Sequence, residues 1–490
     1  MTTQGVTDAP AGPWARLAAL GAAVVLVAAL VAGLIARGDA AVAPVSLEGA
    51  PLEGDPFAYE PDRRGEFEAR AAAGLAHVLY ANSPGGAFHT ARLVARYRDE
   101  IERATASTEI DPDPLEAMVF LESAGRSQVI AGDDPEAAAG LAQIVASTAQ
   151  DLLGMRVDLE RSRKLTRQIN RAYEFGKLER ARRLTAERAR IDERFDPDAA
   201  LAGAVRYLEI AQRRFGADDL AVVSYHMGIG NLEQVIETYL SEEPDPGGDP
   251  VPYAELYFNS SPHSHPQTWD LLASFGDESS EYYWKVLAAE GIMRLYRDDP
   301  AELRELERLQ DGGPTGEQVF HPTDSTETFA DPGQLEAAWS AGAIVPIPES
   351  PELGYALDAG IGELSAEAGS APALYRGLRP EAVATLIYLA ARVREIYGGG
   401  TLTVTSAVRD RASEDLVRDR DPRAIDDYPL HAAGWSFDIA RDYESDTQAG
   451  AFQFVLDRLQ ALALIDYAVE PDVIHVTASD QVGPLLSGGS

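Results

Sequence analysis

The chain has 490 residues and no cysteine, and its 42 Lys and Arg against 79 Asp and Glu give a formal net charge of −37. The absence of cysteine excludes a disulfide-bonded scaffold, a thiol nucleophile and metal sites with thiolate ligands. The acidic balance argues against nucleic acid as the main partner, because a phosphate backbone is bound by an electropositive face. At roughly 100–200 residues per domain, the length allows about two to four domains.

The N-terminal region, residues 1–37, contains an unbroken apolar run at 17–36. A helix of this length spans about 30 Å, the thickness of the hydrocarbon core of a bilayer. We interpret the run as an uncleaved transmembrane anchor, because the apolar part of a secretory signal is usually about 7–15 residues long. A cleaved signal, with a site near Ala43, and a buried core helix are the alternatives. Residues 38–64, rich in Pro, Gly, Ala and acidic residues, are predicted to form a linker.

Residues 65–305 are predicted to form an all-α domain. Runs such as 201–215 and 282–296 carry apolar residues at positions i, i+3, i+4 and i+7. Within this region, residues 156–194 hold 13 Lys and Arg against 7 Asp and Glu. We interpret this insertion as a solvated helical hairpin, with a contact surface for an anionic polymer or another protein as the alternative.

A candidate catalytic carboxyl group lies early in the helical region. Asp113 and Pro114 are typical of a helix start, and Glu122 falls on the face of that helix that also carries Leu115, Met118 and Val119. A lone Glu on a helix is usually solvated, but a Glu on a buried face must be paired or have a raised pKa. A carboxylic acid that keeps its proton can protonate a glycosidic oxygen.

Four motifs in order resemble one family. They are Glu-Ser-Ala-Gly at 122–125, Gly-Leu-Ala-Gln-Ile at 140–144 with Ser-Thr-Ala at 147–149, Ser-Tyr-His-Met-Gly-Ile-Gly-Asn at 224–231, and Tyr-Tyr-Trp-Lys-Val-Leu-Ala at 282–288. Together they resemble the catalytic domain of the soluble lytic transglycosylases (SLT), which has a lysozyme-like fold. Departures from the family pattern are Ala142 in place of Met, and His226 and Met227 in place of Asn and Ala.

The resemblance implies cleavage of the bond between N-acetylmuramic acid and N-acetylglucosamine in peptidoglycan without water. Glu122 would protonate the leaving oxygen and then accept a proton from the muramyl C6 hydroxyl, which gives a 1,6-anhydro product. The resemblance also implies that Ser123, Gln143 and Tyr225 bind substrate or hold the catalytic carboxyl group. It implies no cofactor for this domain.

The remainder of the chain is predicted to be a linker at 306–335, which turns polar and rich in Gly, Pro and Thr, followed by an α+β domain at 336–490. An amphipathic helix is expected at 380–396, and short strands of alternating β-branched residues at 401–405 and 473–477.

Two histidines and an aspartate in the C-terminal domain form a plausible zinc set. His431 and Asp438 are seven positions apart, and His475 lies in a predicted strand. Three such ligands leave a fourth position open on Zn²⁺. The alternative is a loop histidine capped by an aspartate and a strand histidine in a polar layer. His263 and His265 form a rival pair without an evident third ligand.

The C-terminal pattern resembles the D-alanyl-D-alanine carboxypeptidase-like (VanY-like) metallopeptidases. The resemblance rests on His-x-x-Gly-x-Ser-x-Asp at 431–438, the strand histidine at 475, and the strand that ends at Arg409. It implies that His431, Asp438 and His475 bind Zn²⁺ and that Arg409 positions substrate. Asp472 stands where the family often has its general base, whereas the usual Trp before the last His is replaced by Ile474.

The overall expectation is a multidomain protein: an N-terminal transmembrane helix, an all-α lysozyme-like domain and a C-terminal α+β domain. We expect it in the bacterial inner membrane as a single-pass protein, with both catalytic domains in the periplasm and peptidoglycan as the partner. The alternative is a non-catalytic peptidoglycan-binding scaffold with a degenerate peptidase-like domain.

Overall fold

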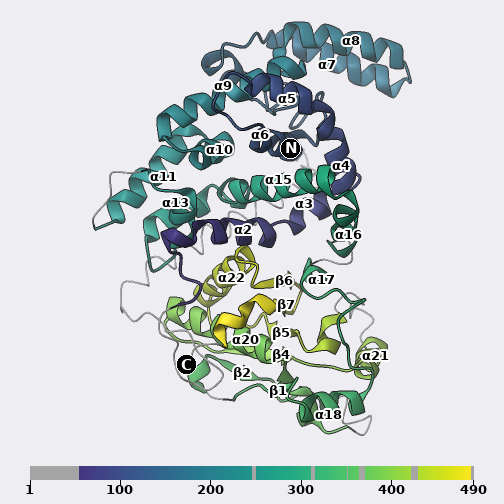
Figure 1. Ribbon diagram of the computed structural model, residues 1–490, viewed down its shortest axis with the longest axis vertical. Coiled ribbons are helices and arrows are strands. Elements are labelled where there is room, and N and C mark those ends of the chain that lie inside the picture. The colour runs from purple at the N-terminus through teal and green to yellow at the C-terminus, as the bar shows by residue number, and fades with distance from the viewer. Residues whose placement is uncertain are drawn as a thin grey trace, which may run out of the picture.

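The structure, a computed structural model, describes residues 55–244, 250–310, 315–349, 351–363, 370–420 and 429–486. Two bodies lie one above the other along the long axis of the molecule: a helical domain and, below it, an α+β domain (Figure 1). The helical domain is compatible with a lysozyme-like fold. These two bodies correspond to the all-α and α+β regions expected from the sequence.

The helical domain is built around α15 (Tyr282–Asp298), which packs against α2, α4 and α6. Its core includes the fully buried Leu115, Leu201, Tyr239 and Trp284. The other helices are α2 (Arg64–Gly74), α3 (His77–Asn82), α4 (Ala87–Val94), α5 (Arg98–Thr105), α6 (Pro112–Ser123), α7 (Leu159–Glu174), α8 (Leu178–Ile191), α9 (Pro197–Phe215), α10 (Asp218–Met227), α11 (Ile229–Glu242), α12 (Tyr253–Asn259), α13 (Pro266–Ser274), α14 (Asp277–Ser280) and α16 (Pro300–Gln310).

Helix α9 shows how local sequence sets these boundaries. Asp196 caps its N-terminus by accepting a hydrogen bond from the amide of Ala199 at 3.1 Å, and Pro197 occupies the first turn. Gly216 ends the helix in the left-handed conformation, with φ of 72°. The buried side chains recur along one side of the helix, which therefore packs against the domain core: Ala200, Leu201, Ala204, Val205, Leu208 and Ala211.

The basic insertion forms the predicted helical hairpin. Helices α7 and α8 pack against each other, and an antiparallel bridge between Val157 and Asp192 closes the base. The hairpin projects from the end of the helical domain that lies farthest from the α+β domain (Figure 1).

The α+β domain contains a five-stranded sheet with strand order β2-β4-β5-β7-β6. Strands β2 and β4 are parallel, and the other neighbouring pairs are antiparallel. Helices α20 and α22 pack against each other and against the sheet. The elements are α17 (Glu317–Phe320), α18 (Pro332–Ser340), β1 (Val345–Pro346), β2 (Tyr355–Leu357), β3 (Gly377–Leu378), α20 (Pro380–Tyr397), β4 (Leu402–Ser406), α21 (Arg411–Arg420), β5 (Ser436–Ala440), α22 (Asp446–Ala461), β6 (Ile465–Val469) and β7 (Val473–Ala478). The helix and strands predicted at 380–396, 401–405 and 473–477 are thus confirmed as α20, β4 and β7.

Both predicted linkers turn out to be packed where the structure describes them. In the 38–64 segment, the part from residue 55 onward buries Phe57 in the core of the α+β domain. In the 306–335 segment, α16 runs on to Gln310, and Phe329 and Leu335 join that same core. In the described parts of these segments, a few apolar side chains between the turns are sufficient to fix the chain to the α+β domain.

The two domains meet along α2 and α22, where their backbones approach closely. A Cβ atom added at Gly74 of α2 would lie 1.9 Å from the carbonyl oxygen of Gln460 in α22. Arg458, also in α22, donates hydrogen bonds to the carbonyls of Tyr257 and Ser260 in the helical domain at 2.9 and 3.1 Å. The domain interface is therefore formed by close contact between the backbones of α2 and α22 and by the hydrogen bonds that Arg458 donates to two carbonyl oxygens.

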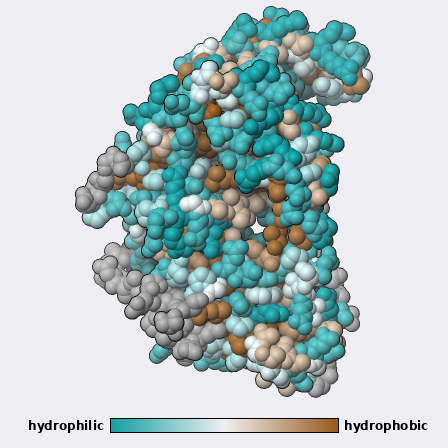
Figure 2. Space-filling view, in the orientation of Figure 1, coloured by the Kyte–Doolittle hydropathy of each residue, from teal (hydrophilic) through white to brown (hydrophobic). Residues whose placement is uncertain are grey.

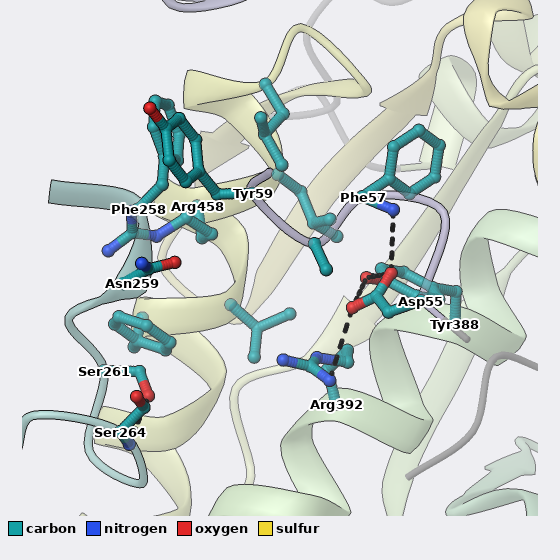
Figure 3. Close-up of a pocket in the computed structure, with 15 residues that line it drawn as sticks. Asp55, Phe57, Tyr59, Phe258, Asn259, Ser261, Ser264, Tyr388, Arg392 and Arg458 are labelled. Atoms are coloured by element: carbon teal, nitrogen blue, oxygen red, sulfur yellow. Dashed lines mark hydrogen bonds and ion pairs between the residues drawn. The ribbon is translucent and has the colours of Figure 1, made fainter. Parts of the chain in front are cut away.

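A cavity of about 250 Å³ lies in this interface. Figure 3 shows Asp55 beside Tyr388 and Arg392 on one side of it and Arg458 beside aromatic rings on the other. The Tyr388 hydroxyl donates to Asp55 at 2.9 Å, and Arg392 lies 3.5 Å from the same carboxylate. Asp55 thus attaches the chain before α2 to α20 of the α+β domain.

No helix in the described part of the chain is long and apolar enough to cross a membrane. The predicted anchor at 17–36 lies outside the described residues.

Candidate active site and candidate metal centre

Glu122 lies in the last turn of α6. This helix begins two residues earlier than expected, because Asp111 rather than Asp113 is the N-cap and accepts a hydrogen bond from the amide of Asp113 at 2.9 Å. The helix ends at Ala124, which adopts the left-handed conformation with φ of 51°. The expected shared face is present: Leu115, Met118 and Val119 are buried, and Glu122 is half-buried at its end.

The carboxyl group of Glu122 has a raised pKa. Burial disfavours its charged form and raises the pKa to about 7, with a further contribution from the negative charge of Glu278. The Tyr282 hydroxyl donates a hydrogen bond to Glu122 Oε1 at 2.7 Å, which favours the carboxylate and limits the rise. Near neutral pH both protonation states are populated, so this group can donate a proton in one step and accept one in another.

Aromatic side chains from three helices, α9, α10 and α15, lie around this carboxyl group. Tyr225 of α10 lies near enough that the charge of Glu122 adds to burial in raising the pKa of its hydroxyl. That hydroxyl donates to the carbonyl of Ala142 at 2.7 Å, and the Tyr207 ring packs edge-on against Tyr225 at 5.1 Å. His226 stacks on Tyr282 with ring centroids 5.0 Å apart. Tyr225 therefore connects the loop at 140–144 to the carboxyl site.

The loop at 140–144 is held by a buried arginine at the base of the hairpin. Arg194 is fully buried and pairs with Asp192 at 2.8 Å. It also donates to the carbonyls of Ala137 and Ile144, at 3.1 and 3.2 Å. Gly140, with φ of +83°, passes so close that a Cβ atom there would lie 1.7 Å from the carbonyl oxygen of Arg194. The hairpin base thus fixes the second motif.

The side chains of Ser123 and Gln143 both donate hydrogen bonds to backbone carbonyl oxygens of the protein. The hydroxyl of Ser123 is buried and donates to the carbonyl of Val119 in its own helix at 3.2 Å. The side-chain amide of Gln143, whose backbone has φ of 47°, donates to the carbonyl of Gly140 at 2.8 Å. Of the four residues predicted for this site, Glu122 and Tyr225 lie together. Tyr282, which contacts the carboxyl group directly, was missed as a site residue, although its motif at 282–288 was recognised.

In the α+β domain, His431, Asp438 and His475 converge. Their ligand atoms all lie within 4.8 Å of one another, and all three side chains are largely buried. His431 Nε2 and His475 Nδ1 lie 3.1 and 3.0 Å from the same oxygen, Oδ1 of Asp438. Strand pairing produces this meeting, because Asp438 of β5 is directly opposite His475 of β7.

The outer nitrogen of each imidazole donates a hydrogen bond to an oxygen acceptor. His431 Nδ1 donates to the carbonyl of Ala407 at 2.9 Å, since a carbonyl can only accept. His475 Nε2 donates to Glu317 Oε2 at 3.1 Å. Burial alone would lower the pKa of His475, but its hydrogen bonds to Asp438 and Glu317 outweigh this effect and raise the pKa to about 9. The two inner nitrogens face the shared carboxylate.

Three further residues bear on this cluster. Arg409 donates to Ser406 Oγ at 2.6 Å and lies 3.3 Å from Asp438 Oδ2, next to a cavity lined by Thr405, Ser406 and Arg409 among others. Asp472 is exposed in the turn between β6 and β7. The prediction that Asp472 serves this site is therefore not supported by its position. The carboxylate that does contact the cluster is Glu317, which sequence reasoning placed in a linker.

Residues 168–245 match the family model of the transglycosylase SLT domain. The match begins within α7 and covers the third motif, including Tyr225; Glu122, Gln143 and Tyr282 lie outside it. It supports a lytic transglycosylase-type function with peptidoglycan as the substrate. Comparisons with curated proteins and with solved structures found no match.

Proposed function

We propose that the helical domain is a lytic transglycosylase that cleaves the bond between N-acetylmuramic acid and N-acetylglucosamine, with Glu122 as both acid and base. The observation that carries the proposal is the half-buried carboxyl group with a pKa of about 7 in a domain that contains the SLT match. A group with this pKa is protonated often enough to act as the acid and ionised often enough to act as the base.

In the first step, the proton on Glu122 moves to the glycosidic oxygen as the bond from that oxygen to the muramyl C1 breaks. The carboxylate left behind is stabilised by the hydrogen bond from Tyr282. In the second step, the C6 hydroxyl attacks C1 and its proton returns to Glu122. The enzyme recovers its starting state, and no water is consumed.

The test is incubation of the purified protein with peptidoglycan sacculi, followed by mass spectrometry of the released fragments. We expect 1,6-anhydro ends, lighter by one water molecule than hydrolysed ends, and their loss in Glu122→Gln, which keeps the shape but cannot donate the catalytic proton. Glu278→Gln is the control for a two-carboxylate hydrolase. Release of reducing ends that is lost in Glu278→Gln would show that the domain is a hydrolase and not a lyase. Binding to sacculi without cleavage would favour a non-catalytic peptidoglycan-binding scaffold.

We further propose that His431, Asp438 and His475 hold Zn²⁺ in a VanY-like peptidase domain that acts on stem peptides. The support is the donor set itself: two inner nitrogens and a carboxylate oxygen converge, and each histidine donates its outer N–H to a carbonyl or carboxylate, as zinc-binding histidines usually do. When bound, zinc would supply a Lewis acid that polarises a peptide carbonyl. Arg409 would orient the substrate carboxylate from the adjoining cavity.

Metal analysis of the purified chain tests this proposal. We expect about one zinc per chain, with loss of the metal in His431→Ala, because two remaining ligands rarely retain zinc. Zinc content unaffected by His431→Ala, or no zinc uptake at all, would leave the cluster as a polar layer of the sheet.

We also propose that residues 17–36 anchor the protein in the bacterial inner membrane, with both domains in the periplasm. The length of the apolar run and the cell-wall substrate support this placement. Fractionation and protease accessibility of intact spheroplasts test it. A soluble form beginning near residues 41–44 would show that the segment is a cleaved signal.

A further inference from the structure

The free end of the hairpin formed by α7 and α8 carries exposed apolar side chains. Tyr173, Phe175 and Leu178 are 54%, 62% and 54% exposed, and they lie within six residues of one another where the two helices join. Large apolar residues this exposed are few in the described part of the chain, and the others are dispersed over both domains. A cluster at the tip of a projecting element is a feature that solvation alone does not explain.

Cations surround this apolar tip. Arg171 and Lys177 both lie over the Phe175 ring, at 5.7 and 5.8 Å from its centroid. Further exposed Lys and Arg side chains of the hairpin have no ion-pair partner among the described residues, and they include Lys164, Arg167, Arg180, Arg183 and Arg190. The hairpin is therefore locally positive, although the chain as a whole carries a net charge of −37.

The spacing of these cations places them on one side of each helix, together with Glu160 on α7 and Glu187 on α8. Positions 164, 167 and 171 share one side of α7, and positions 180, 183 and 190 share one side of α8. The opposite sides of the helices pack together through residues such as Leu165, Ile169 and Ala181. Figure 2 shows the hairpin as a mainly hydrophilic projection at the top of the molecule.

The base of the hairpin is fixed to the rest of the helical domain. Its helices extend about 20 Å from the bridge between Val157 and Asp192, at 1.5 Å per residue. At that base, the buried pair of Arg194 and Asp192 is tied to the loop of the second motif. A surface bound at the tip would therefore be held at a fixed distance from the carboxyl site.

We propose that the tip of this hairpin binds the surface of a membrane that contains anionic lipids. Tyr173, Phe175 and Leu178 enter the interfacial layer, and the flanking Lys and Arg side chains contact the lipid headgroups. Apolar and aromatic residues framed by Lys and Arg are the composition of interfacial membrane-binding elements. A hydrated anionic polymer would use the cations but would leave the three apolar side chains in water, so the lipid surface accounts for both observations.

The test uses residues 55–490, so that the predicted anchor at 17–36 does not contribute to binding. This shortened chain retains both hydrophobic cores, whose buried members begin at Phe57. Its sedimentation is measured with vesicles of phosphatidylcholine and phosphatidylglycerol, and with vesicles of phosphatidylcholine alone. We expect binding to the anionic vesicles only, and weaker binding as salt rises and screens the charges.

Two variants separate the two parts of the surface. Arg171→Gln with Arg183→Gln should weaken binding about 30-fold, because each basic residue near an anionic surface contributes about fivefold. Phe175→Ser should weaken it about tenfold through the loss of apolar burial. The matched controls, Arg96→Gln with Arg213→Gln and Val469→Ser, change exposed residues outside the hairpin and should bind as the parent chain does.

Three results would overturn the proposal: no binding to the anionic vesicles, equal losses in the control variants, or tip-dependent binding to peptidoglycan sacculi without binding to vesicles. The last result would assign the tip to the cell-wall polymer. Lytic activity on sacculi is measured in parallel, so that failure of membrane binding and failure of the proposed enzymatic function are distinguished.

Discussion

Replacement of Glu122 by Gln should stabilise the protein at neutral and alkaline pH while it abolishes cleavage. The pKa of Glu122 is about 7 in the folded protein and 4.5 as an ordinary glutamate. A group whose folded pKa is raised binds more protons in the folded state, so its contribution to stability is complete below about pH 4.5 and is lost as the pH rises through about 7. At about 1.4 kcal/mol per pH unit between the two values, ionisation costs up to about 3 kcal/mol above pH 8.

Gln cannot ionise, so the variant does not lose this stability as the pH rises. The difference in free energy of unfolding between Glu122→Gln and the wild type should increase from about pH 4.5 to 8 by as much as about 3 kcal/mol in favour of the variant. Denaturant unfolding followed by circular dichroism at a series of pH values measures it. Comparison of two chains at each pH cancels the titration of all other groups.

Glu290 of α15 provides a matched control. Burial raises its pKa to about 7 as well, with Asp113 and Asp111 contributing. Glu290→Gln should therefore show the same pH-dependent stabilisation but retain anhydro-product formation. A stability difference for Glu122→Gln that stays constant over this pH range would refute the raised pKa of Glu122 and with it the explanation of how one carboxyl group serves both steps.

Other substitutions test single contacts. Tyr282→Phe removes a hydrogen bond that favours the Glu122 carboxylate, so the pH above which kcat/KM falls should rise by about one unit, and an unchanged profile would contradict this role. Gly74→Ala should destabilise the domain interface by about 1–3 kcal/mol in calorimetry, because its methyl group meets the α22 backbone, whereas Gly65→Ala in the same helix has open space and should be neutral or stabilising. Glu317→Gln should weaken zinc binding about 10–100-fold in competition with a chelator while the metal still binds, and an affinity equal to that of the wild type would exclude a supporting role for this carboxylate.

Local patterns in the sequence predicted the helical and α+β character of the two domains and the residues proposed for both sites. The 3.6-residue periodicity predicted helices such as α9 and α15, since it reflects which side of a helix is buried. The local excess of Lys and Arg at 156–194 predicted the solvated hairpin. The position of Glu122 on an apolar face follows from helix geometry alone. The set of His431, Asp438 and His475 was predicted from the residue types and from the resemblance to the VanY-like metallopeptidases, not from geometry, because His475 lies 37 positions from Asp438.

The partners of these residues were decided by tertiary packing alone. Tyr282 contacts Glu122 across 160 positions, and Glu317 contacts His475 across 158. No spacing rule links such positions, because their distance depends on how α15 packs on α6 and on how the segment after α16 folds back onto β7. The same cause explains why Asp472, close to His475 in sequence, is exposed in a turn, while Glu317, from a segment predicted to be a linker, contacts His475. A chain's local pattern sets which surfaces must be buried, but only the packed structure sets which surfaces meet.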